Sequence, residues 1–553
     1  MIAFFNKIKS LSAAQTAGYI GLLGFIVNCA VFLVYLKSPI SSFLLWDAAH
    51  YWDWALGIAG GDWPGNSVFH QPPLYPYLLA LFITVFGKTL TPVYFFQSVL
   101  SAATAAMVSR LTVSITGSRK TGVVAGLLYV LYGMQLFYSF KILSECVATF
   151  LLVLTALLMT SEKMRVRTIA AGSVMGAVLL VKPHFLMAIP LLCGFYLFRT
   201  PEEPRSVALK QVIMFVVASG IVVSMATVRN LIVAKEFTLV SQNGGETFYI
   251  GNNAHANGTY TPVEGLSSDI AYQNRDVVAR AQEHTGKPMS RSEVSRYWYN
   301  KAFSWMACHP ADWLRLELTK LLNLFSGAEL SNMYLLSFER KNITPIFRAA
   351  FVNFYLLFPF FFAGCIAATG SWRRHYPAWV LLGVNSVTML LFFVDERFRV
   401  ITMPFFIVMC GMGIVRLGMM VTVKKIRKSI FRQPVFIAFM AGLVMLAPVY
   451  SRDRRFPSQE WRMRMALGDI AYGKGEIDAS LDCYIKASEL NKTNCMPAFM
   501  VSKAMFAKGY HDVAAQLYRT TIKTVNDDDR RTIMRNRDFN PLREYVKGNG
   551  GVK

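Results

Sequence analysis

The sequence predicts an all-α polytopic membrane protein with about 11 transmembrane helices, an extracytoplasmic insert and a small α-helical C-terminal domain. Of its 553 residues, 54% are hydrophobic and only 16% are charged. The water-facing surface of a soluble chain this long needs about a quarter of its residues charged. Uncharged runs of about 20 residues, which cross a ~30 Å hydrocarbon core, recur along most of the chain. These observations exclude a disordered chain and an ordinary soluble fold.

The charge balance does not indicate a nucleic-acid partner. The 57 Lys and Arg residues outnumber the 33 acidic residues and give a net charge of +24. In a soluble protein this excess would favour nucleic acid, but here the basic residues form short clusters between apolar runs, which is typical of cytosolic loops. The 8 Cys residues show no CxxC spacing and predict neither a zinc site nor disulfides.

The uncharged runs predict eleven membrane spans. The first follows Lys7 and Lys9 and lacks a small-residue cleavage site, so we expect an uncleaved anchor with a cytosolic N-terminus. The spans are Thr16–Leu36, Thr91–Ser109, Thr121–Phe140, Cys146–Ser161, Thr168–Val181, Pro183–Phe198, Gln211–Val228, Ala349–Ser371, Tyr376–Val394, Val400–Val415 and Gln433–Ser451.

The apolar run Pro73–Phe86 is too short to be counted as a span and begins in a cluster of prolines, so we expect a re-entrant or interfacial helix. Omitting it places about 17 Lys and Arg residues of the short loops inside and about 6 outside, as the positive-inside rule requires. The same rule makes Thr168–Phe198 a hairpin that turns on the outer side at Lys182 and Pro183.

This topology divides the chain into a membrane domain, residues 1–450, and an extracytoplasmic tail, residues 451–553. Within the membrane domain, residues 37–72 form an outer loop and residues 229–348 an outer insert. The insert begins SQNGGETFYIGNNAHANGTY, which predicts turns, and continues with helical sequence from Glu293 to Leu324.

The tail contains a repeat of 34 residues, typical of tetratricopeptide (TPR) helix pairs. Leu467, Gly475, Ile477 and Tyr484 recur as Val501, Gly509, His511 and Tyr518. Two such pairs are predicted. They cap the membrane domain or dock a protein partner, and the sequence does not choose between these roles.

Ionisable residues gather at the predicted outer membrane boundary. Each costs several kcal/mol at this depth unless it is paired or solvated, so their number predicts one shared polar cavity. The alternative is that each ends its own helix at the headgroups. They are Asp47, His50, Asp53, Asp62, His70, Lys141, Glu145, Lys182, His184, Arg229, Asp395, Glu396, Arg397 and Arg399.

In the first outer loop, Asp47, Tyr51 and Ala55 share one face of a short amphipathic helix. A carboxylate there lies where water meets lipid. Transfer of a sugar from a phospholipid carrier needs a general base and cations that hold the leaving phosphate. Asp47 suits the first role, and the second suits Lys182, Arg229, Arg397 and Arg399. The scattered His residues predict no zinc site.

These residues carry a resemblance to a known family. D47-x3-Y51-x3-A55, then GDW, PPLYPYLLALFITVFG, SE at 144–145 and RFRVITMPFF at 397–406 together resemble the GT-C glycosyltransferases of the polyprenyl-phosphate-sugar class. That class includes bacterial aminoarabinose transferases and protein O-mannosyltransferases, and the resemblance spans most of residues 10–450.

The resemblance implies an inverting transfer from an undecaprenyl- or dolichyl-phosphate sugar to a lipid, glycan or protein hydroxyl on the extracytoplasmic face. It implies no cofactor, with divalent assistance as an option, and no metal ligand is assigned. Asp47 would be the base, His70 and the PPLYP turn would line the cavity, and Lys182 would meet the donor phosphate. Glu145 would bind acceptor hydroxyls or cap its helix. Ala48 departs from the family, since many members have an acidic residue there.

The expected location is the bacterial inner membrane, with a cytosolic N-terminus and a periplasmic C-terminal domain. Two other classes stay open. A transporter or flippase for a lipid-linked or anionic substrate would also surround a polar cavity with many spans, but would place charges at mid-membrane. A membrane-anchored scaffold would explain the tail and leave the charged residues unexplained. The identities of the sugar and of the acceptor depend on cavity shape and are not predicted.

Overall fold

The computed structural model describes residues 11–160, 164–198, 204–263, 265–266, 270–331, 334–422, 433–453, 459–492, 494–525, 530, 533–534 and 539–548. These residues are almost entirely helices and their connections, and the extended pairing among them is one isolated bridge between Tyr132 and Val352. The predicted all-α class is confirmed.

Helices of the membrane domain follow the apolar runs because each run is long enough to satisfy its backbone hydrogen bonds internally. Up to the insert they are α2 (Ala13–Tyr35), η1 (Pro39–Ser42), α3 (Asp47–Ala59), α4 (Leu74–Phe86), α5 (Thr91–Thr116), α6 (Arg119–Val130), α7 (Gly133–Tyr138), α8 (Glu145–Met159), α9 (Met164–Val181), η2 (Pro183–Met187), α10 (Ala188–Phe198) and α11 (Arg205–Ala234). After the insert they are α17 (Phe354–Ala368), η4 (Thr369–Ser371), α18 (Trp372–Leu391), α19 (Glu396–Val400), α20 (Met403–Thr422) and α22 (Pro434–Asp453).

The insert and the tail are also helical. The insert contains α12 (Gly244–Gly251), α13 (Ile270–Thr285), α14 (Arg291–Cys308), α15 (Pro310–Leu324), α16 (Leu336–Asn342) and η3 (Pro345–Ala349). The tail contains α23 (Glu460–Gly473), α24 (Ile477–Leu490), α25 (Met496–Ala507), α26 (His511–Thr524) and α28 (Asn540–Gly548).

A helix occupies each of the eleven predicted spans. Six helical stretches among the described residues are long and apolar enough to cross a membrane: Ala13–Tyr35, Thr91–Thr116, Arg205–Ala234, Phe354–Leu391, Met403–Thr422 and Pro434–Asp453. The others are shorter, and the predicted span Thr121–Phe140 is broken between α6 and α7. The chain is a multi-pass membrane protein, and the exact number of crossings stays a prediction.

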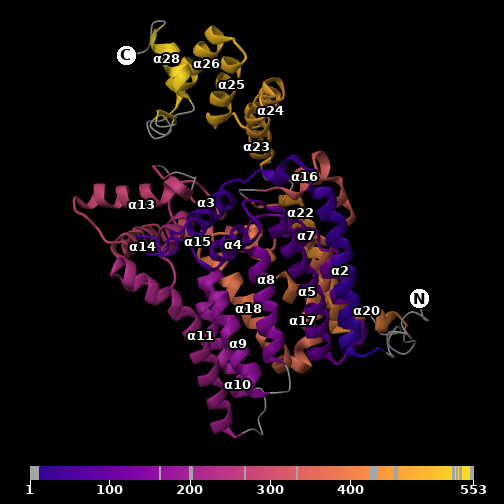
Figure 1. Cartoon of the computed structure of the whole chain (residues 1–553). Helices are drawn as coiled ribbons and strands as arrows, with labels where there is room; N and C mark the ends of the chain where they lie inside the picture. The colour runs from indigo at the N-terminus through magenta and orange to yellow at the C-terminus, as the bar shows by residue number, and fades with distance from the viewer. Residues whose placement is uncertain are drawn as a thin grey trace.

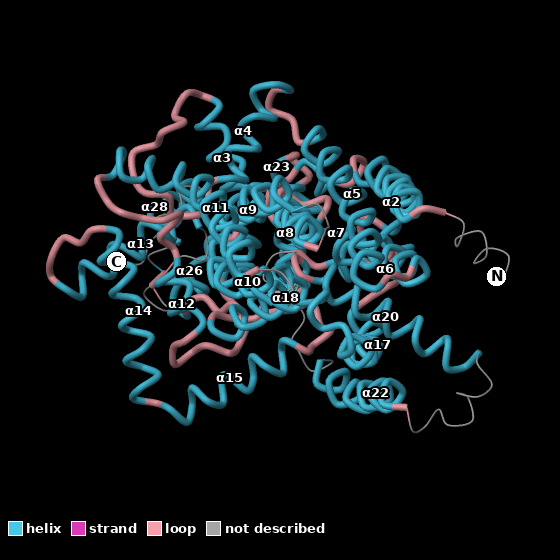
Figure 2. The backbone as a smooth tube through the Cα atoms, turned by 90° about the horizontal axis from the view of Figure 1, so that it is seen from below, coloured by secondary structure: helices cyan, strands magenta, loops and turns pink. Residues whose placement is uncertain are grey.

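The long helices form an upright bundle, and the three predicted outer segments lie at one end of it (Figure 1). The helices α3 and α4, the insert helices α13 to α16 and the C-terminal helices all lie at this upper end. Figure 2 views the bundle end-on, with α2 beside α5 and with α22 beside α17 at its periphery. The side of the membrane that this end faces stays a prediction.

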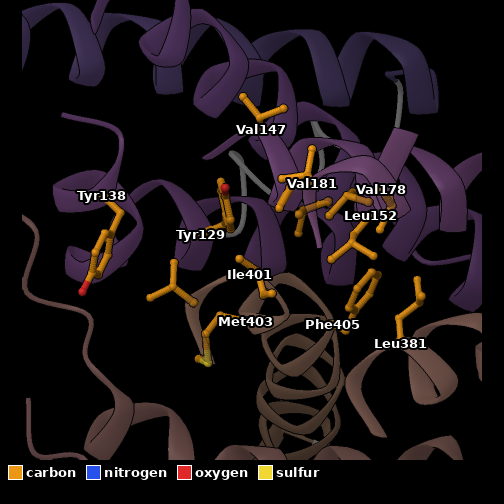
Figure 3. Packing of buried hydrophobic residues seen from close by; sticks show 14 of the residues in the cluster. Tyr129, Tyr138, Val147, Leu152, Val178, Val181, Leu381, Ile401, Met403 and Phe405 are labelled. Carbon is orange, nitrogen blue, oxygen red and sulfur yellow. The ribbon is translucent and has the colours of Figure 1, made fainter. Parts of the chain in front are cut away.

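The core of the bundle lies between α6, α8, α9, α18 and α20. Figure 3 shows apolar side chains of the first three helices facing those of α18 and α20. Close packing of this kind fixes the ends of these helices relative to one another. The labelled residues are Tyr129, Tyr138, Val147, Leu152, Val178, Val181, Leu381, Ile401, Met403 and Phe405, all buried.

The Gly-rich start of the insert was predicted to form turns, but residues 244–251 form the helix α12. Its glycines allow close packing. A Cβ atom on Gly245 would lie 2.1 Å from the carbonyl oxygen of Ser295, and one on Gly251 would lie 1.9 Å from that of Phe392. The prediction was wrong for residues 244–251, because glycine is used both for turns and for close backbone contact. Turns and bends do follow at residues 252–255 and 258–259.

The predicted helix pairs of the tail are present. α23 packs against α24, and α25 packs against α26. Gly475 and Gly509, one repeat apart, both have a positive φ in the turn between paired helices, and Tyr484 and Tyr518 are both buried. The identification of these pairs as tetratricopeptide repeats stays a prediction.

Candidate functional site

Four of the predicted site residues lie at helix ends near the upper end of the bundle. Asp47 is the first residue of α3 and Glu145 the first of α8. Lys182 lies between α9 and η2, and Arg397 belongs to α19. An apolar helix ends where its sequence becomes polar, so packing the helices side by side brings their terminal charges together.

Asp47 is held in place by an unusual backbone. The preceding Trp46 has a φ of 46°, in a region that costs a non-glycine residue about 1–3 kcal/mol. The Trp46 ring packs edge-on against Tyr334, with ring centroids 6.4 Å apart. This packing stabilises the sharp turn from which α3 starts and sets the direction of the Asp47 side chain.

Arg397 joins Asp47 to a second carboxylate. Its Nη1 donates a 2.6 Å hydrogen bond to Asp47 Oδ2, and its Nε lies 3.8 Å from Asp395 Oδ2. Burial lowers the pKa of Arg397, but Asp47 and Asp395 outweigh burial and raise the pKa well above its usual value. Burial raises the pKa of Asp395 to about 6, although the Arg397 charge opposes the rise. Arg397 is therefore a permanent cation between two acids.

Lys182 and Glu145 form a second ion pair beside the first. The Lys182 Nζ lies 3.0 Å from Glu145 Oε1, and their side chains are 10% and 2% exposed. The same Nζ lies 5.3 Å from the centre of the Phe398 ring, and the Arg397 guanidinium lies 4.8 Å from that ring. Phe398 therefore links the two cations by contacts in cation–π range. We call Asp47, Glu145, Lys182, Asp395 and Arg397 the charged group.

Two buried oxygens of the charged group accept no hydrogen bond from the described residues. They are Glu145 Oε2 and Asp395 Oδ2. Buried carboxylate oxygens are normally hydrogen-bonded, so these atoms suit the hydroxyl groups of a bound substrate. Asp395 was among the charged residues of the sequence but was not singled out as a site residue.

Tyr51 belongs to the same surroundings and was noted for its place on the helix face and in the family motif, but not as a site residue. It is buried one turn after Asp47 and packs edge-on against Tyr75 at 5.5 Å. Burial raises its pKa far above the usual value, and the charges of Asp47 and Glu145 add to the rise. Tyr51 is therefore a neutral hydrogen-bonding group beside both carboxylates, and the spacing of four residues was the signal for it.

Arg399 is held by different partners. Its Nη2 donates a 2.9 Å hydrogen bond to Glu396 Oε1, its Nη1 donates to the carbonyl oxygen of Ser326, and its guanidinium lies 4.3 Å from the Phe354 ring centre. Burial raises the pKa of Glu396 to about 7 against the effect of Arg399.

An apolar cavity of about 250 Å³ adjoins Arg399. Ser386, Arg399 and Thr402 supply polar groups to its wall. The aromatic rings lining it are those of Phe325, Phe354, Phe361, Trp379 and Phe406. A cavity of this composition fits an apolar chain with a polar end.

Arg229 does not join the charged group. It lies near the end of α11, which continues to Ala234, so the insert begins later than the predicted boundary at residue 229. Its guanidinium donates hydrogen bonds to the carbonyl oxygens of Pro64 and Ser67 and lies 4.0 Å from the Phe69 ring centre. Arg229 therefore anchors the first outer loop. Arg229 differs from the prediction because backbone carbonyl oxygens accept the hydrogen bonds of a guanidinium as readily as phosphate oxygens do.

His70 lies in a different small pocket. Its Nε2 is 3.1 Å from Glu246 Oε1, and Gln242 and Arg291 line the same pocket. Burial lowers the pKa of His70 to about 3, and burial raises the pKa of Glu246 well above its usual value. The prediction that His70 lines the cavity of Asp47 is not supported. His70 instead connects the first outer loop to the insert.

The described residues contain no cluster of three or more His, Cys, Asp and Glu side chains with metal-ligand geometry. Independence from metal stays a prediction.

A family profile matches part of the chain. Residues 70–229 match the profile of the family described as dolichyl-phosphate-mannose-protein mannosyltransferase. This match confirms the resemblance to GT-C glycosyltransferases of the polyprenyl-phosphate-sugar class, and the segment contains Glu145 and Lys182. No curated protein matches the sequence.

Among solved structures, the chain is similar to the archaeal oligosaccharyltransferase AglB from Archaeoglobus fulgidus in complex with an inhibitory peptide and a dolichol-phosphate. The identity is 12% and the TM-score is 0.42. The alignment covers 84% of this chain and 59% of that protein, so the chain spans about three-fifths of its length.

Proposed function

We propose that this protein is a membrane glycosyltransferase that moves a sugar from a polyprenyl-phosphate carrier to an acceptor hydroxyl on the extracytoplasmic face, with inversion at the anomeric carbon. The observation that carries the proposal is the charged group, in which Asp47 and Arg397 meet at 2.6 Å beside Lys182 and Glu145. The family match over residues 70–229 supports the donor class.

Asp47 would be the general base. Arg397 holds Oδ2, and in this proposal Oδ1 receives the acceptor proton. As that proton leaves, the acceptor oxygen forms a bond to the anomeric carbon. The bond between this carbon and the donor phosphate oxygen breaks, and the polyprenyl phosphate departs with the electron pair. Attack opposite the leaving group inverts the anomeric carbon.

Cations would stabilise the phosphate as it gains charge. Lys182 and Arg397 both contact the Phe398 ring, at 5.3 Å and 4.8 Å from its centre. Arg399 lies at the wall of the apolar cavity of about 250 Å³. In this proposal the cavity receives the first part of the isoprenoid chain, which places the phosphate at the charged group.

The test is sugar transfer by membrane vesicles carrying Asp47→Asn. Removing a general base lowers the rate by about 10²- to 10⁴-fold, so we expect transfer from a polyprenyl-phosphate sugar to fall by that factor. Asp53→Asn is the matched control, because Asp53 is an exposed Asp of the same helix, and it should transfer at the wild-type rate. Equal rates in the two variants would refute the role of Asp47, and no transfer by wild type from any polyprenyl-phosphate sugar would refute the function.

A further inference from the structure

The insert contains a helix whose apolar face points away from the protein. Four leucines of α15 recur with the i, i+4, i+7, i+8 spacing of one helix face: Leu314, Leu318, Leu321 and Leu322. Their exposed fractions are 67%, 56%, 41% and 43%. In a water-soluble domain a row of apolar residues at this spacing faces the core. The face that α15 presents to its surroundings is therefore unsuited to water.

The opposite face of α15 is buried and partly polar. Lys320 and Asn323 are fully buried there, beside Leu316. The Lys320 Nζ donates hydrogen bonds to Asn252 Oδ1 at 2.9 Å and to Glu317 Oε1 at 2.7 Å, so its charge is satisfied within the protein. α15 thus turns polar groups inward and leucines outward, which is the arrangement of a helix with lipid on its outer side.

α15 packs against a helix of a membrane-spanning stretch. This neighbour, α18, belongs to the stretch Phe354–Leu391, which is long and apolar enough to cross a membrane. Val387 and Leu391, in the last turns of α18, are 49% and 43% exposed. Exposed apolar side chains of such a stretch face lipid, and the exposed leucines of α15 lie on the adjacent helix. The lipid-facing surface of the bundle therefore continues onto α15.

The direction of α15 fits a helix that lies on a bilayer surface. Figure 2 looks along the bundle and shows α15 along its length, so this helix runs across the direction of the spanning helices. Trp305 in the last turn of α14 and Trp313 in the first turn of α15 flank the bend between the two helices. Tryptophan is enriched at the level of the lipid headgroups, and these features together are typical of interfacial helices.

We propose that α15 is an interfacial helix seated in the bilayer leaflet at the upper end of the bundle, with phospholipid acyl chains against its four exposed leucines. The partner of this surface is the phospholipid of the membrane. The inference goes beyond the proposed function, because it concerns how the insert is held and applies to any reaction at the charged group. The insert is then attached to the membrane as well as to the bundle.

The seat of α15 also bears on the apolar cavity. The helix ends at Leu324, which lines the cavity, and Arg399 Nη1 lies 3.5 Å from the carbonyl oxygen of Leu324. Leu321 and Leu322 precede Leu324 by less than one helical turn. The same short segment therefore contacts lipid and forms part of the cavity wall, so the membrane contact fixes the position of that wall.

The test is photocrosslinking of the full chain in nanodiscs of phosphatidylethanolamine and phosphatidylglycerol. The photoreactive residue p-benzoylphenylalanine replaces Leu318 in one variant and Leu322 in another. Mass spectrometry of the irradiated protein detects the adducts. We expect an adduct with the mass of one phospholipid at both positions, and two positions are used so that the test does not depend on the folding of one variant.

Asp312 is the matched control position. It belongs to the same helix and its side chain is 60% exposed. It precedes Leu314 by two residues, so it projects from nearly the opposite side of the helix. With the photoreactive residue at Asp312 we expect loss of the phospholipid adduct.

Three results would overturn the proposal and leave the proposed function standing. Equal phospholipid adducts at Asp312 and at the two leucine positions would show unspecific contact with lipid. An adduct of twice the chain mass would assign the face to a second copy of this chain. The absence of any adduct at both leucine positions would show that the face lies in water.

Discussion

Arg397 and Asp47 are 350 residues apart in the sequence and form a 2.6 Å hydrogen-bonded ion pair. Their side chains are 13% and 17% exposed, so the pair is shielded but reachable from solvent. At this distance Arg397 fixes Asp47 Oδ2 and thereby sets the orientation of the whole carboxylate, Oδ1 included. The pair joins the first outer loop to the segment between α18 and α20, and each of our predictions for the site depends on it.

Replacing Arg397 should impair transfer more than binding of the acceptor. In Arg397→Gln, Asp47 and Asp395 lose their shared cation, and we expect kcat for sugar transfer to fall about 10²- to 10³-fold, as for loss of an electrostatic donor. Arg397→Lys should retain part of the rate, because one ammonium cannot contact both acids with a fork. Arg416→Gln on the exposed surface of α20 is the control and should match wild type. A wild-type kcat in Arg397→Gln would contradict the assignment.

The pairing of Lys182 with Glu145 and its proposed binding of phosphate can be separated by experiment. Lys182→Met alone leaves the buried Glu145 uncompensated, which costs about 3–5 kcal/mol. Adding Glu145→Gln should restore most of the melting temperature. Transfer should stay at least tenfold below wild type in the double variant. Recovery of both stability and transfer would show that Lys182 serves only as a structural partner.

A third ion pair, Lys141 with Glu339, tests the stability of the outer end without touching the charged group. The two atoms lie 2.6 Å apart with side chains at most 1% exposed, and Lys141 also donates to Tyr35 at 3.1 Å. Lys141→Met should destabilise the protein by about 3–5 kcal/mol, and Lys141→Met with Glu339→Leu should recover much of that loss. Thermal unfolding in detergent measures both. Equal melting temperatures for wild type and Lys141→Met would contradict this.

Stability should depend on pH through Glu246. Because its pKa is raised on folding, the folded state keeps a proton that the unfolded state releases above about pH 4.5, its usual pKa. Its contribution to stability is therefore full below that pH and is lost as the pH rises. Glu246→Gln removes this loss. The melting temperature of the variant should therefore rise relative to that of wild type as the pH increases from 5 to 8. Glu283→Gln, with a side chain 64% exposed, is the control and should show a constant difference. A difference in melting temperature between Glu246→Gln and wild type that stays constant with pH would refute the shift.

Removing divalent ions should leave transfer intact. Asp47 and Glu145 each have a cationic side chain within 3.0 Å, which neutralises the charge that would attract a divalent ion. We expect the rate in EDTA to equal the rate in magnesium. A loss that magnesium reverses would contradict this prediction.

The convergence of Asp47, Glu145, Lys182 and Arg397 was predictable because each lies at or beside the end of a helix at the same end of the bundle. Arg229 was not, since the sequence does not tell whether a guanidinium at a helix end meets a ligand or, as here, the carbonyls of Pro64 and Ser67. The pairing of His70 with Glu246 depends on how the insert folds over the loop. These contacts are tertiary, and local patterns do not specify them.

α23 packs on one side against Ile40, Leu335 and Phe338 and on the other against α24, which limits how the protein can be dissected. A shortened chain that stops after α22 would leave Ile40, Leu335 and Phe338 facing water, and the isolated tail would expose Met463 and Ile470. Each part alone would expose apolar side chains to water. The C-terminal helices can therefore be transferred to another protein only together with the residues of the membrane domain on which they pack.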